Sequence, residues 1–427
     1  MMKAADVFHT LDITLKPDPS RTVIRPFSFN YPDAFSNGRP TRAEAVAARL
    51  MALDPAMRQR ILDLLHHAMR TRHRNVDQVF LRRFEEVKDQ LGVTVEASCD
   101  RLLIGAYFSQ EYAFESAALF NPSIVPVPDQ DPDDDNIAFI LSLRGVGEGH
   151  VSSVTFRSGS WDGGNGLVID PPSSQGVPPR VEKGDDDGWV RLCSEESQDI
   201  SETVIFPILP SQRQGVEDLR MVHFTDHDGT QSIIGTYTAF DGREARAELI
   251  RGIDLRTYEM RPLAGAMAAY KGMALFPRRV DGRFVMLGRQ DNENIWLLRS
   301  DDLHCWETGE IIMRPKYPWE FVQMGNCGSP IEIDEGWLVF THGVGLVRGY
   351  CVGACLLDKD DPSKVLARTP SPLLFPSAEQ RGGYVPNVTY SCGALLHKRR
   401  VLLPYAIGDE FSAFAVGSVD DLLSVMV

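Results

Sequence analysis

The sequence predicts an all-β fold, a five-bladed β-propeller, with an α-helical extension at its N-terminus. The first observation is a repeat. From about residue 100 the chain cycles five times through a short strand, a tight turn, a longer apolar strand, a polar cluster and another strand. The second observation is the period, roughly 50–60 residues, which is typical of propeller blades and too long for most solenoids. A β-sandwich is the main structural alternative.

The five copies share apolar strands, and three of them have a turn in which glycine follows an acidic residue. Asp228–Gly229, Asp281–Gly282 and Glu335–Gly336 stand between expected strands, where hairpin turns need a residue that tolerates positive φ. Each copy therefore predicts one antiparallel sheet. The copies run through 137–156, 221–240, 274–298, 331–357 and 388–419.

A different pattern precedes the repeats. A proline-punctuated arm comes first, and three amphipathic helices follow it. Thr41 and Glu44 make the capping-box pattern of a helix start, and Pro55 begins a second helix. We expect residues 1–104 to form the arm and a helical cap, and residues 105–427 to form the propeller. The helices are interpreted as a cap packed on the main domain, with a lid or a dimerisation element as the alternative.

Composition excludes several classes of protein. The chain has 427 residues, of which 43% are hydrophobic, so it can build a large core. Its net charge of -15 disfavours nucleic acid and anionic membrane surfaces as partners. No stretch reaches the roughly 20 apolar residues of a membrane span. The start of the chain lacks the apolar run of a signal peptide, and the seven cysteines form no CxxC pair, so we expect a cytoplasmic protein.

The polar clusters between the strands carry the functional information. They combine amides, carboxylates, aromatic rings and a few cations. In a propeller the innermost strands deliver such side chains to a central axis, where ligands bind. This mixture suits a carbohydrate, because sugars are neutral and rich in hydroxyl groups. The clusters occupy 215–220, 271–278, 288–294, 325–330, 341–345 and 387–393.

Cleavage of a glycosidic bond needs a carboxylic acid that protonates the leaving oxygen. It also needs a second group across the ring, either a base that activates water or a nucleophile. Carboxylates are abundant in the clusters, so composition alone leaves the choice of this pair open.

In their order along the chain, the clusters resemble those of glycoside hydrolase family 130, which contains β-mannoside phosphorylases and mannosidases. The resemblance covers residues 105–427 and implies a five-bladed propeller that cleaves β-mannosidic bonds. The family's Glu-Asp-Pro-Arg motif is similar to Glu217–Arg220, which implies that Asp218 is the general acid, although Leu219 replaces the proline. The implied contacts to the cleaved sugar are Asn121, Arg144, Tyr237 and Asp409.

The family's members use either phosphate or water as the attacking group. Lys271, His342 and Tyr350 match three of the four side chains that bind phosphate in the phosphorylases, but Met260 stands near the place of the arginine. Loss of a bidentate cation weakens a site for a dianion. The clusters also resemble the β-1,2-mannosidase branch. The sequence therefore favours hydrolysis of β-1,2-linked manno-oligosaccharides with inversion, and the alternative is a phosphorylase that releases α-mannose 1-phosphate.

Hydrolysis needs a base that activates water. Glu293 is the first candidate, because it lies in a polar cluster at the end of an expected inner strand. Glu332 and Glu320 flank another cluster and are alternatives. Glu293 could instead bind a sugar hydroxyl, Glu320 could lie at the surface beside Trp319, and Glu332 could point outward from its strand. The remaining expected substrate contacts are His150, Arg289, Asp291, Asn292, Asn326 and Asn387.

Two further classes stay open. One is a sugar-binding propeller without catalysis, and the other is an arabinan-type propeller hydrolase, whose three acidic motifs are not found in this sequence. The expected partners are a manno-oligosaccharide or another β-mannoside, with inorganic phosphate under the alternative. No cofactor and no catalytic metal are expected, because the histidines lack the spacing of metal ligands. The sequence leaves the linkage and the formation of a homo-oligomer open.

Overall fold

The computed structural model describes residues 3–27, 41–131, 133–184, 188–252, 254, 256–377, 380 and 382–427. Part of the expected N-terminal arm, residues 28–40, lies outside this description. The chain divides into two compact units. We call them the helical unit (Ser20–Ala113 and Ser173–Pro178) and the β-rich unit (Met1–Pro19, Phe114–Pro172 and Pro179–Val427).

The helical unit packs its helices around one apolar core. The expected capping box is confirmed, since Thr41 and Glu44 bond each other's backbone N–H groups at the start of α1. Close packing of α3 on α4 needs glycine at position 105, because a Cβ there would lie 1.9 Å from the carbonyl oxygen of Phe80. Helix α4 and the antiparallel pairing of β2 with β3 were not predicted from the sequence. The elements are α1 (Arg42–Met51), α2 (Pro55–Met69), α3 (Val76–Val87), α4 (Ser98–Tyr107), β2 (Thr22–Pro26) and β3 (Ser109–Ala113). None of the described helices is long and apolar enough to cross a membrane.

The chain is mostly β, as predicted, and most of its strands belong to the β-rich unit. The first two antiparallel groups of strands form one continuous sheet, because Gly215 at the start of β11 pairs in parallel with Ser152 at the start of β6. The first group is β4 (Ala118–Pro126), β5 (Ile137–Val146), β6 (Ser152–Trp161), β7 (Leu167–Ile169) and β10 (Val204–Ile205). The second is β11 (Gly215–Thr225), β12 (Gln231–Phe240), β13 (Ala245–Gly252), β14 (Thr257–Pro262), β9 (Val190–Cys193) and β8 (Arg180–Lys183).

Three further antiparallel sheets follow in chain order. In the last one, the N-terminal strand β1 pairs with the C-terminal strand β27, with His9 opposite Val416. The third sheet is β15 (Ala274–Leu275), β16 (Phe284–Gly288), β17 (Ile295–Ser300) and β18 (Gly309–Met313). The fourth is β19 (Gln323–Asn326), β20 (Ile331–Ile333), β21 (Gly336–Val344), β22 (Tyr350–Leu357) and β23 (Val365–Arg368). The fifth is β24 (Thr389–Tyr390), β25 (Leu395–His397), β26 (Arg400–Ile407), β27 (Phe411–Ser418) and β1 (His9–Leu15).

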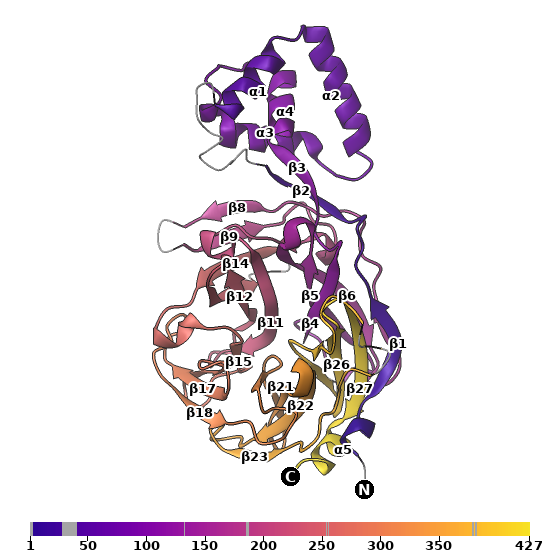
Figure 1. Cartoon of the computed structure of the whole chain (residues 1–427), viewed down its shortest axis with the longest axis vertical. Coiled ribbons are helices and arrows are strands. Elements are labelled where there is room, and N and C mark those ends of the chain that lie inside the picture. The colour runs from indigo at the N-terminus through magenta and orange to yellow at the C-terminus, as the bar shows by residue number, and fades with distance from the viewer. Residues whose placement is uncertain are drawn as a thin grey trace. The chain divides into compact units, whose positions relative to one another are not determined.

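Each group of strands packs on the next through its own apolar core, and the last packs on the first. Leu119 of β4 and Leu402 of β26 belong to the cluster between the fifth and first groups. The other four clusters lie between the first and second, second and third, third and fourth, and fourth and fifth groups. Figure 1 shows the groups following one another around the β-rich unit in chain order. This arrangement brings the first strand of each group to a common centre.

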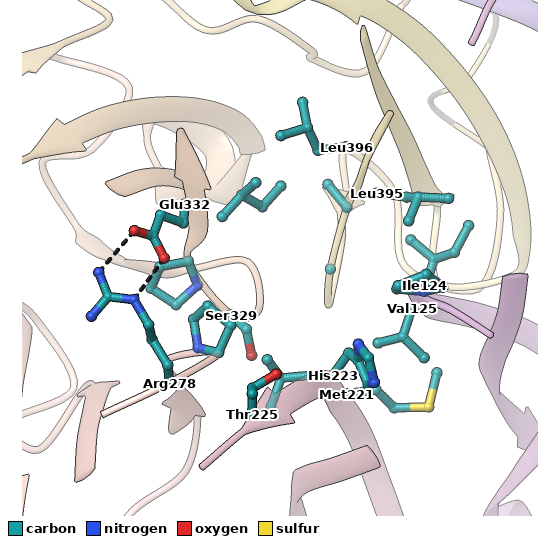
Figure 2. Close-up of a pocket in the computed structure, with 17 residues that line it drawn as sticks. Ile124, Val125, Met221, His223, Thr225, Arg278, Ser329, Glu332, Leu395 and Leu396 are labelled. Carbon is teal, nitrogen blue, oxygen red and sulfur yellow. Dashed lines mark hydrogen bonds and ion pairs between the residues drawn. The ribbon is translucent and has the colours of Figure 1, made fainter. Parts of the chain in front are cut away.

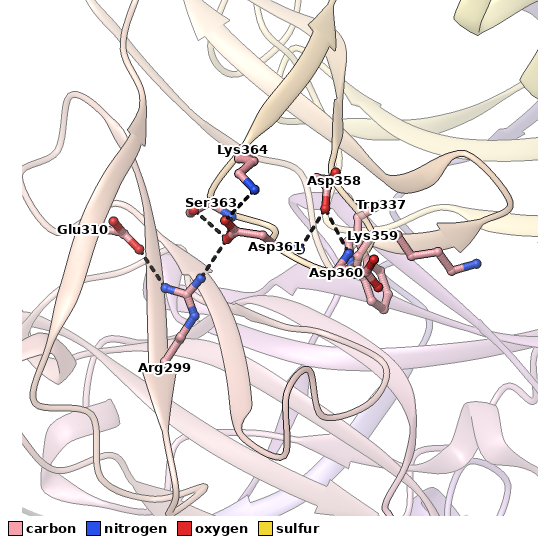
Figure 3. Close-up of polar contacts among 9 residues, drawn as sticks. All are labelled: Arg299, Glu310, Trp337, Asp358, Lys359, Asp360, Asp361, Ser363 and Lys364. Carbon is pink, nitrogen blue, oxygen red and sulfur yellow. Dashed lines mark hydrogen bonds and ion pairs between the residues drawn. The ribbon is translucent and has the colours of Figure 1, made fainter.

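A polar network joins the third and fourth sheets near the surface (Figure 3). Arg299 of β17 donates to Glu310 of β18 at 2.7 Å and to Asp361 of the loop between β22 and β23 at 3.4 Å. The same loop accepts a hydrogen bond from the indole N–H of buried Trp337, at the carbonyl of Lys359 (3.0 Å). Exposed ion pairs contribute little to stability. The network's main effect is to satisfy the buried indole and to fix this loop.

Candidate active site

A polar pocket of about 170 Å³ is lined by residues from all five groups of strands. Every group contributes at least one side chain to its wall. The pocket is lined by Asn121, Arg144, Glu217, Asp218, Arg220, Thr238, Lys271, Gly272, Arg289, Arg348, Tyr350, Val388, Tyr390 and Asp409. The structure thus brings together seven of the side chains predicted from the sequence, namely Asn121, Arg144, Asp218, Lys271, Arg289, Tyr350 and Asp409.

Local backbone distortions deliver three of these side chains. Asp218 has φ 53° and lies where the pairing register of β11 shifts, between Glu217 and Arg220. Asn121 has φ 48° at a matching register shift in β4. Asp409 has φ 52° in the turn between β26 and β27. Bulges and left-handed residues re-aim side chains at the cost of local strain, and they concentrate at functional sites.

Asp218 is held by two donors. The Asn121 amide donates to Oδ1 of Asp218 at 2.6 Å, and Nη1 of Arg144 reaches the same oxygen at 3.1 Å. The other arm of the Arg144 guanidinium donates to Glu217 at 2.7 Å. The guanidinium of Arg144 also lies over the ring of Phe120, 5.0 Å from its centre. One arginine therefore fixes both carboxylates of the sequence motif.

The three carboxylates of the pocket have different proton affinities. Burial alone would raise the pKa of Asp218, but the charge of Arg144, the hydrogen bond from Asn121 and the charge of Lys271 hold that pKa below its usual value. Burial raises the pKa of Glu217. Burial, together with the nearby charge of Asp218, raises the pKa of Asp409 to about 6. In the free site Asp218 is therefore the most readily ionised of the three.

Three cations of the pocket are not held in short ion pairs by the described carboxylates. Among the described residues, Lys271, Arg289 and Arg348 form no ion pair with a carboxylate. Arg289 is 8% exposed, and its Nε is buried without a hydrogen-bond partner in the described part of the chain. Arg348 has φ 54°, and its guanidinium lies 5.6 Å from the ring centre of Tyr350. Unpaired buried donors beside free cations are suited to an anion that accepts several hydrogen bonds.

The guanidinium of Arg220 is held by hydrogen bonds to groups of the protein. It donates to the carbonyl oxygens of Gly272 (2.8 Å) and Asn326 (3.1 Å) and to the hydroxyl of Tyr390 (2.7 Å). These partners come from the third, fourth and fifth groups of strands, whereas Arg220 belongs to the second. Arg220 therefore braces the centre of the unit and holds the turn that carries Lys271.

Other predicted contacts lie beside or away from the pocket wall. His342 is 1% exposed and lies behind Arg289. Asn326 is buried, and the carbonyl of Asn387 accepts the backbone N–H of Tyr350 at 2.9 Å. The Tyr237 hydroxyl is enclosed with Gln212 and Glu248. His150 stacks on Tyr384, and Asp291 and Asn292 lie in an exposed turn after β16.

None of the three candidate bases lines this pocket. Glu293 is an exposed residue of the turn after β16. Glu320 is 1% exposed and pairs with Arg368 at 2.6 Å. Glu332 forms a two-point ion pair with Arg278 at 2.7 and 2.8 Å and lines another cavity.

The sequence analysis missed Glu217, Arg348 and Tyr390 as pocket residues. Glu217 belongs to the Glu217–Arg220 motif. Its position next to Asp218 was the signal that could have identified it as a pocket residue. Arg348 lies in a tight loop closed by a hydrogen bond from Gly345 N–H to Gly349 C=O (3.0 Å). The sequence did contain a signal for Arg348. Gly345 and Gly349 stand on either side of it, directly after an apolar strand. Among the described residues, no three His, Cys, Asp or Glu side chains gather in a way that could hold a metal ion.

Comparison with known proteins places the sequence among β-mannoside phosphorylases by similarity. Residues 188–427 match the sequence model of glycoside hydrolase family 130, described as beta-1,4-mannooligosaccharide phosphorylase. A 1,2-beta-oligomannan phosphorylase of Thermoanaerobacter sp. (strain X514) is 33% identical over 214 residues, which are 49% of this chain and 70% of the relative. A beta-1,2-mannobiose phosphorylase of the same organism is 35% identical over 213 residues, 49% of this chain and 68% of the relative.

A solved structure shows the same fold. It is the beta-1,2-mannobiose phosphorylase from Listeria innocua in complex with beta-1,2-mannobiose. It superposes with a TM-score of 0.52 at 18% sequence identity and covers 73% of this chain and 92% of its own. Because the family model covers more than half of the sequence, the chain belongs to glycoside hydrolase family 130.

Proposed function

We propose that this chain is a β-mannoside phosphorylase, in which inorganic phosphate attacks the anomeric carbon and releases α-mannose 1-phosphate. One observation carries the proposal. Lys271, Arg289 and Arg348 bring three cations without carboxylate partners, among the described residues, to a pocket that also holds Asp218. A dianion needs fixed cations to replace its water shell.

This proposal departs from the hydrolysis that the sequence favours. That interpretation depended on Met260 at the expected place of an arginine, and Met260 is fully buried in β14. Arg289 and Arg348 supply cations from the loops that follow β16 and β21. The matched relatives are also named phosphorylases. Glu293, Glu320 and Glu332, the bases considered for hydrolysis, do not line the pocket.

The proposed reaction is a single displacement. A phosphate oxygen forms a bond to C1 of the mannosyl unit on the face opposite the leaving group, the bond from C1 to the glycosidic oxygen breaks, and that oxygen takes a proton. Asn121, Arg144 and Asp409 would hold the mannosyl ring, and Asp218 would supply the proton directly or through a sugar hydroxyl. Phosphate bound on the three cations adds negative charge beside Asp218, which raises its pKa and favours the protonated form.

We also infer that the β-rich unit is the catalytic domain and a five-bladed propeller. Five groups of strands in chain order, five apolar clusters between them and the pairing of β1 with β27 support this. Its substrate would be a manno-oligosaccharide.

Product analysis tests the function. The enzyme is incubated with β-1,2-mannobiose and, separately, with β-1,4-mannobiose, each with and without phosphate. Mannose 1-phosphate together with mannose supports the proposal. Mannose as the sole product in both buffers overturns it in favour of hydrolysis.

A further inference from the structure

A second cavity, of about 340 Å³, lies at the opposite ends of the strands that form the active pocket. Its wall includes Ile124–Pro126, which follow Asn121 on β4, and Met221–His223 with Thr225, which follow Asp218 on β11. Seven residues of extended strand from Asp218 to Thr225 span about 23 Å. The cavity is therefore separate from the active pocket. We call it the rear cavity.

The walls of the rear cavity are divided by polarity. Figure 2 shows Ile124, Val125 and Leu395 on one side of it and the ion pair of Arg278 with Glu332 on the other. His223, Thr225 and Ser329 lie between these two sides (Figure 2). A ligand that fits must offer an apolar face on one side and hydrogen-bonding groups on the other.

The arginine on the polar side is already paired with a carboxylate. Glu332 bonds Arg278 at two points, at 2.7 and 2.8 Å, and its Oε1 lies 3.5 Å from Nζ of Lys359. Arg278 also lies over the ring of Trp337, 4.9 Å from its centre. Because the guanidinium is already committed to a carboxylate and a ring, it is not available as a free anion site. This distinguishes the rear cavity from the active pocket.

Two polar atoms of the wall lack partners. Among the described residues, neither Nε2 of His223 nor Oγ of Ser329 has a hydrogen-bond partner, and both atoms are buried. Unsatisfied buried polar atoms are uncommon in native proteins, and each needs an explanation. Both residues line the cavity, so a ligand that fills it would contact the side chains that carry these unpartnered atoms.

We propose that the rear cavity binds a neutral sugar, such as a single mannose unit, as a second saccharide site separate from the active pocket. A pyranose has an apolar face for Ile124, Val125 and Leu395 and hydroxyl groups for His223 and Ser329. The cavity volume lies at the lower end of the range for small-molecule sites. A sugar that displaces poorly ordered water from the apolar side gains affinity.

The test uses the full chain labelled with 13C at the methionine methyl groups. Met221 lines the rear cavity, and its signal is identified by its loss in Met221→Leu. D-mannose is titrated in phosphate-free buffer. The Met221 signal is expected to shift saturably in the wild type. In the double variant His223→Leu/Ser329→Ala, the mannose concentration at half of the full shift should rise at least tenfold. In Ala394→Phe, whose ring fills the cavity, the shift should disappear.

His227→Leu is the matched control, because this histidine lies next to β11 but its side chain is 76% exposed and outside the cavity. Its titration should equal that of the wild type. Asp218→Asn should also leave the Met221 titration unchanged, so the site is tested independently of the proposed reaction. A Met221 signal that stays fixed throughout, or that moves equally in the wild type and the double variant, overturns the proposal and leaves a cavity that holds water only.

Discussion

Nη1 of Arg289 lies 3.1 Å from Nε2 of His342. A guanidinium only donates hydrogen bonds, so this ring nitrogen accepts and the ring is neutral. Burial, followed by the charges of Arg289 and Arg220, holds the pKa of His342 well below its usual value, which agrees with this assignment. Nδ1 then carries the proton and faces Sγ of Cys327 at 3.9 Å. The structure places His342 behind Arg289, as the group that orients it.

His342→Leu should therefore weaken phosphate binding. The variant leaves a buried N–H of Arg289 without an acceptor, which costs about 1–3 kcal/mol. We expect the KM for phosphate to rise about tenfold, with a smaller change in the KM for the mannoside. Steady-state kinetics with each substrate varied in turn measure this. His342→Asn restores an acceptor and should recover part of the loss. Equal losses for both substrates would contradict the assignment.

Asp218→Asn should keep the fold and lower kcat by at least about 10²-fold, because general acid catalysis contributes that much. A mannoside with a very good leaving group needs less protonation and should be affected less. The kcat of the variant on an aryl mannoside and on mannobiose are compared. If both substrates lose equally and their KM values rise, Asp218 binds the sugar and does not supply the proton.

Asp409 should make the stability of the chain depend on pH. Its pKa is raised from 3.8 to about 6, so the native state binds the proton more tightly than the unfolded state. The resulting contribution to the free energy of unfolding is fully present below pH 3.8 and is lost as the pH rises through 6. A shift of about two units corresponds to roughly 3 kcal/mol. Asp409→Asn should flatten the fall in stability between pH 4 and 6.5, as measured by urea unfolding. If the dependence of stability on pH is the same in Asp409→Asn as in the wild type, Asp409 does not cause the fall in stability.

Glu320 should act in folding and not in catalysis. It is buried, pairs with Arg368 at 2.6 Å and accepts the backbone N–H groups of Lys316 and Tyr317 at 2.9 Å. Removing one partner of a buried pair costs about 3–5 kcal/mol. Glu320→Ala should lower the midpoint of urea unfolding, while kcat per folded molecule stays within about twofold of the wild type.

The control for Glu320 is Glu293→Ala. Glu293 is exposed, so we expect a change in stability below about 0.5 kcal/mol and full activity. Loss of kcat in Glu293→Ala, with partial rescue by azide, would support the base that the sequence analysis favoured.

The repeat of apolar strands was sufficient to predict a mostly β chain, because short apolar runs and acidic-glycine turns are local signals. The capping box at Thr41 was predicted for the same reason and is confirmed. The helix α4 was missed. Its N-cap, Ala97, makes no side-chain cap hydrogen bond, so the usual sequence signal for a helix start is absent.

The pocket was harder to predict, because its side chains come from all five groups of strands. Asp218 and Asn121 were identified by motif, and they lie 2.6 Å apart. Arg348 was not identified, since it reaches the pocket through a backbone with φ 54°, a conformation that arginine seldom adopts. Glu320 and Glu332 stood beside a polar cluster in the sequence, but Arg368 and Arg278 neutralise them. These pairings are long-range, and sequence spacing does not reveal them.

The initial rate of mannobiose cleavage as phosphate is titrated from zero tests the central claim most directly. The account predicts no turnover without phosphate, a saturable rise with phosphate, and one α-mannose 1-phosphate formed for each bond cleaved. Lys271→Met and Arg348→Met should each raise the KM for phosphate about tenfold or more, because each removes a cation from the dianion site. Turnover at full rate in phosphate-free buffer, with mannose as the sole product, would contradict the account.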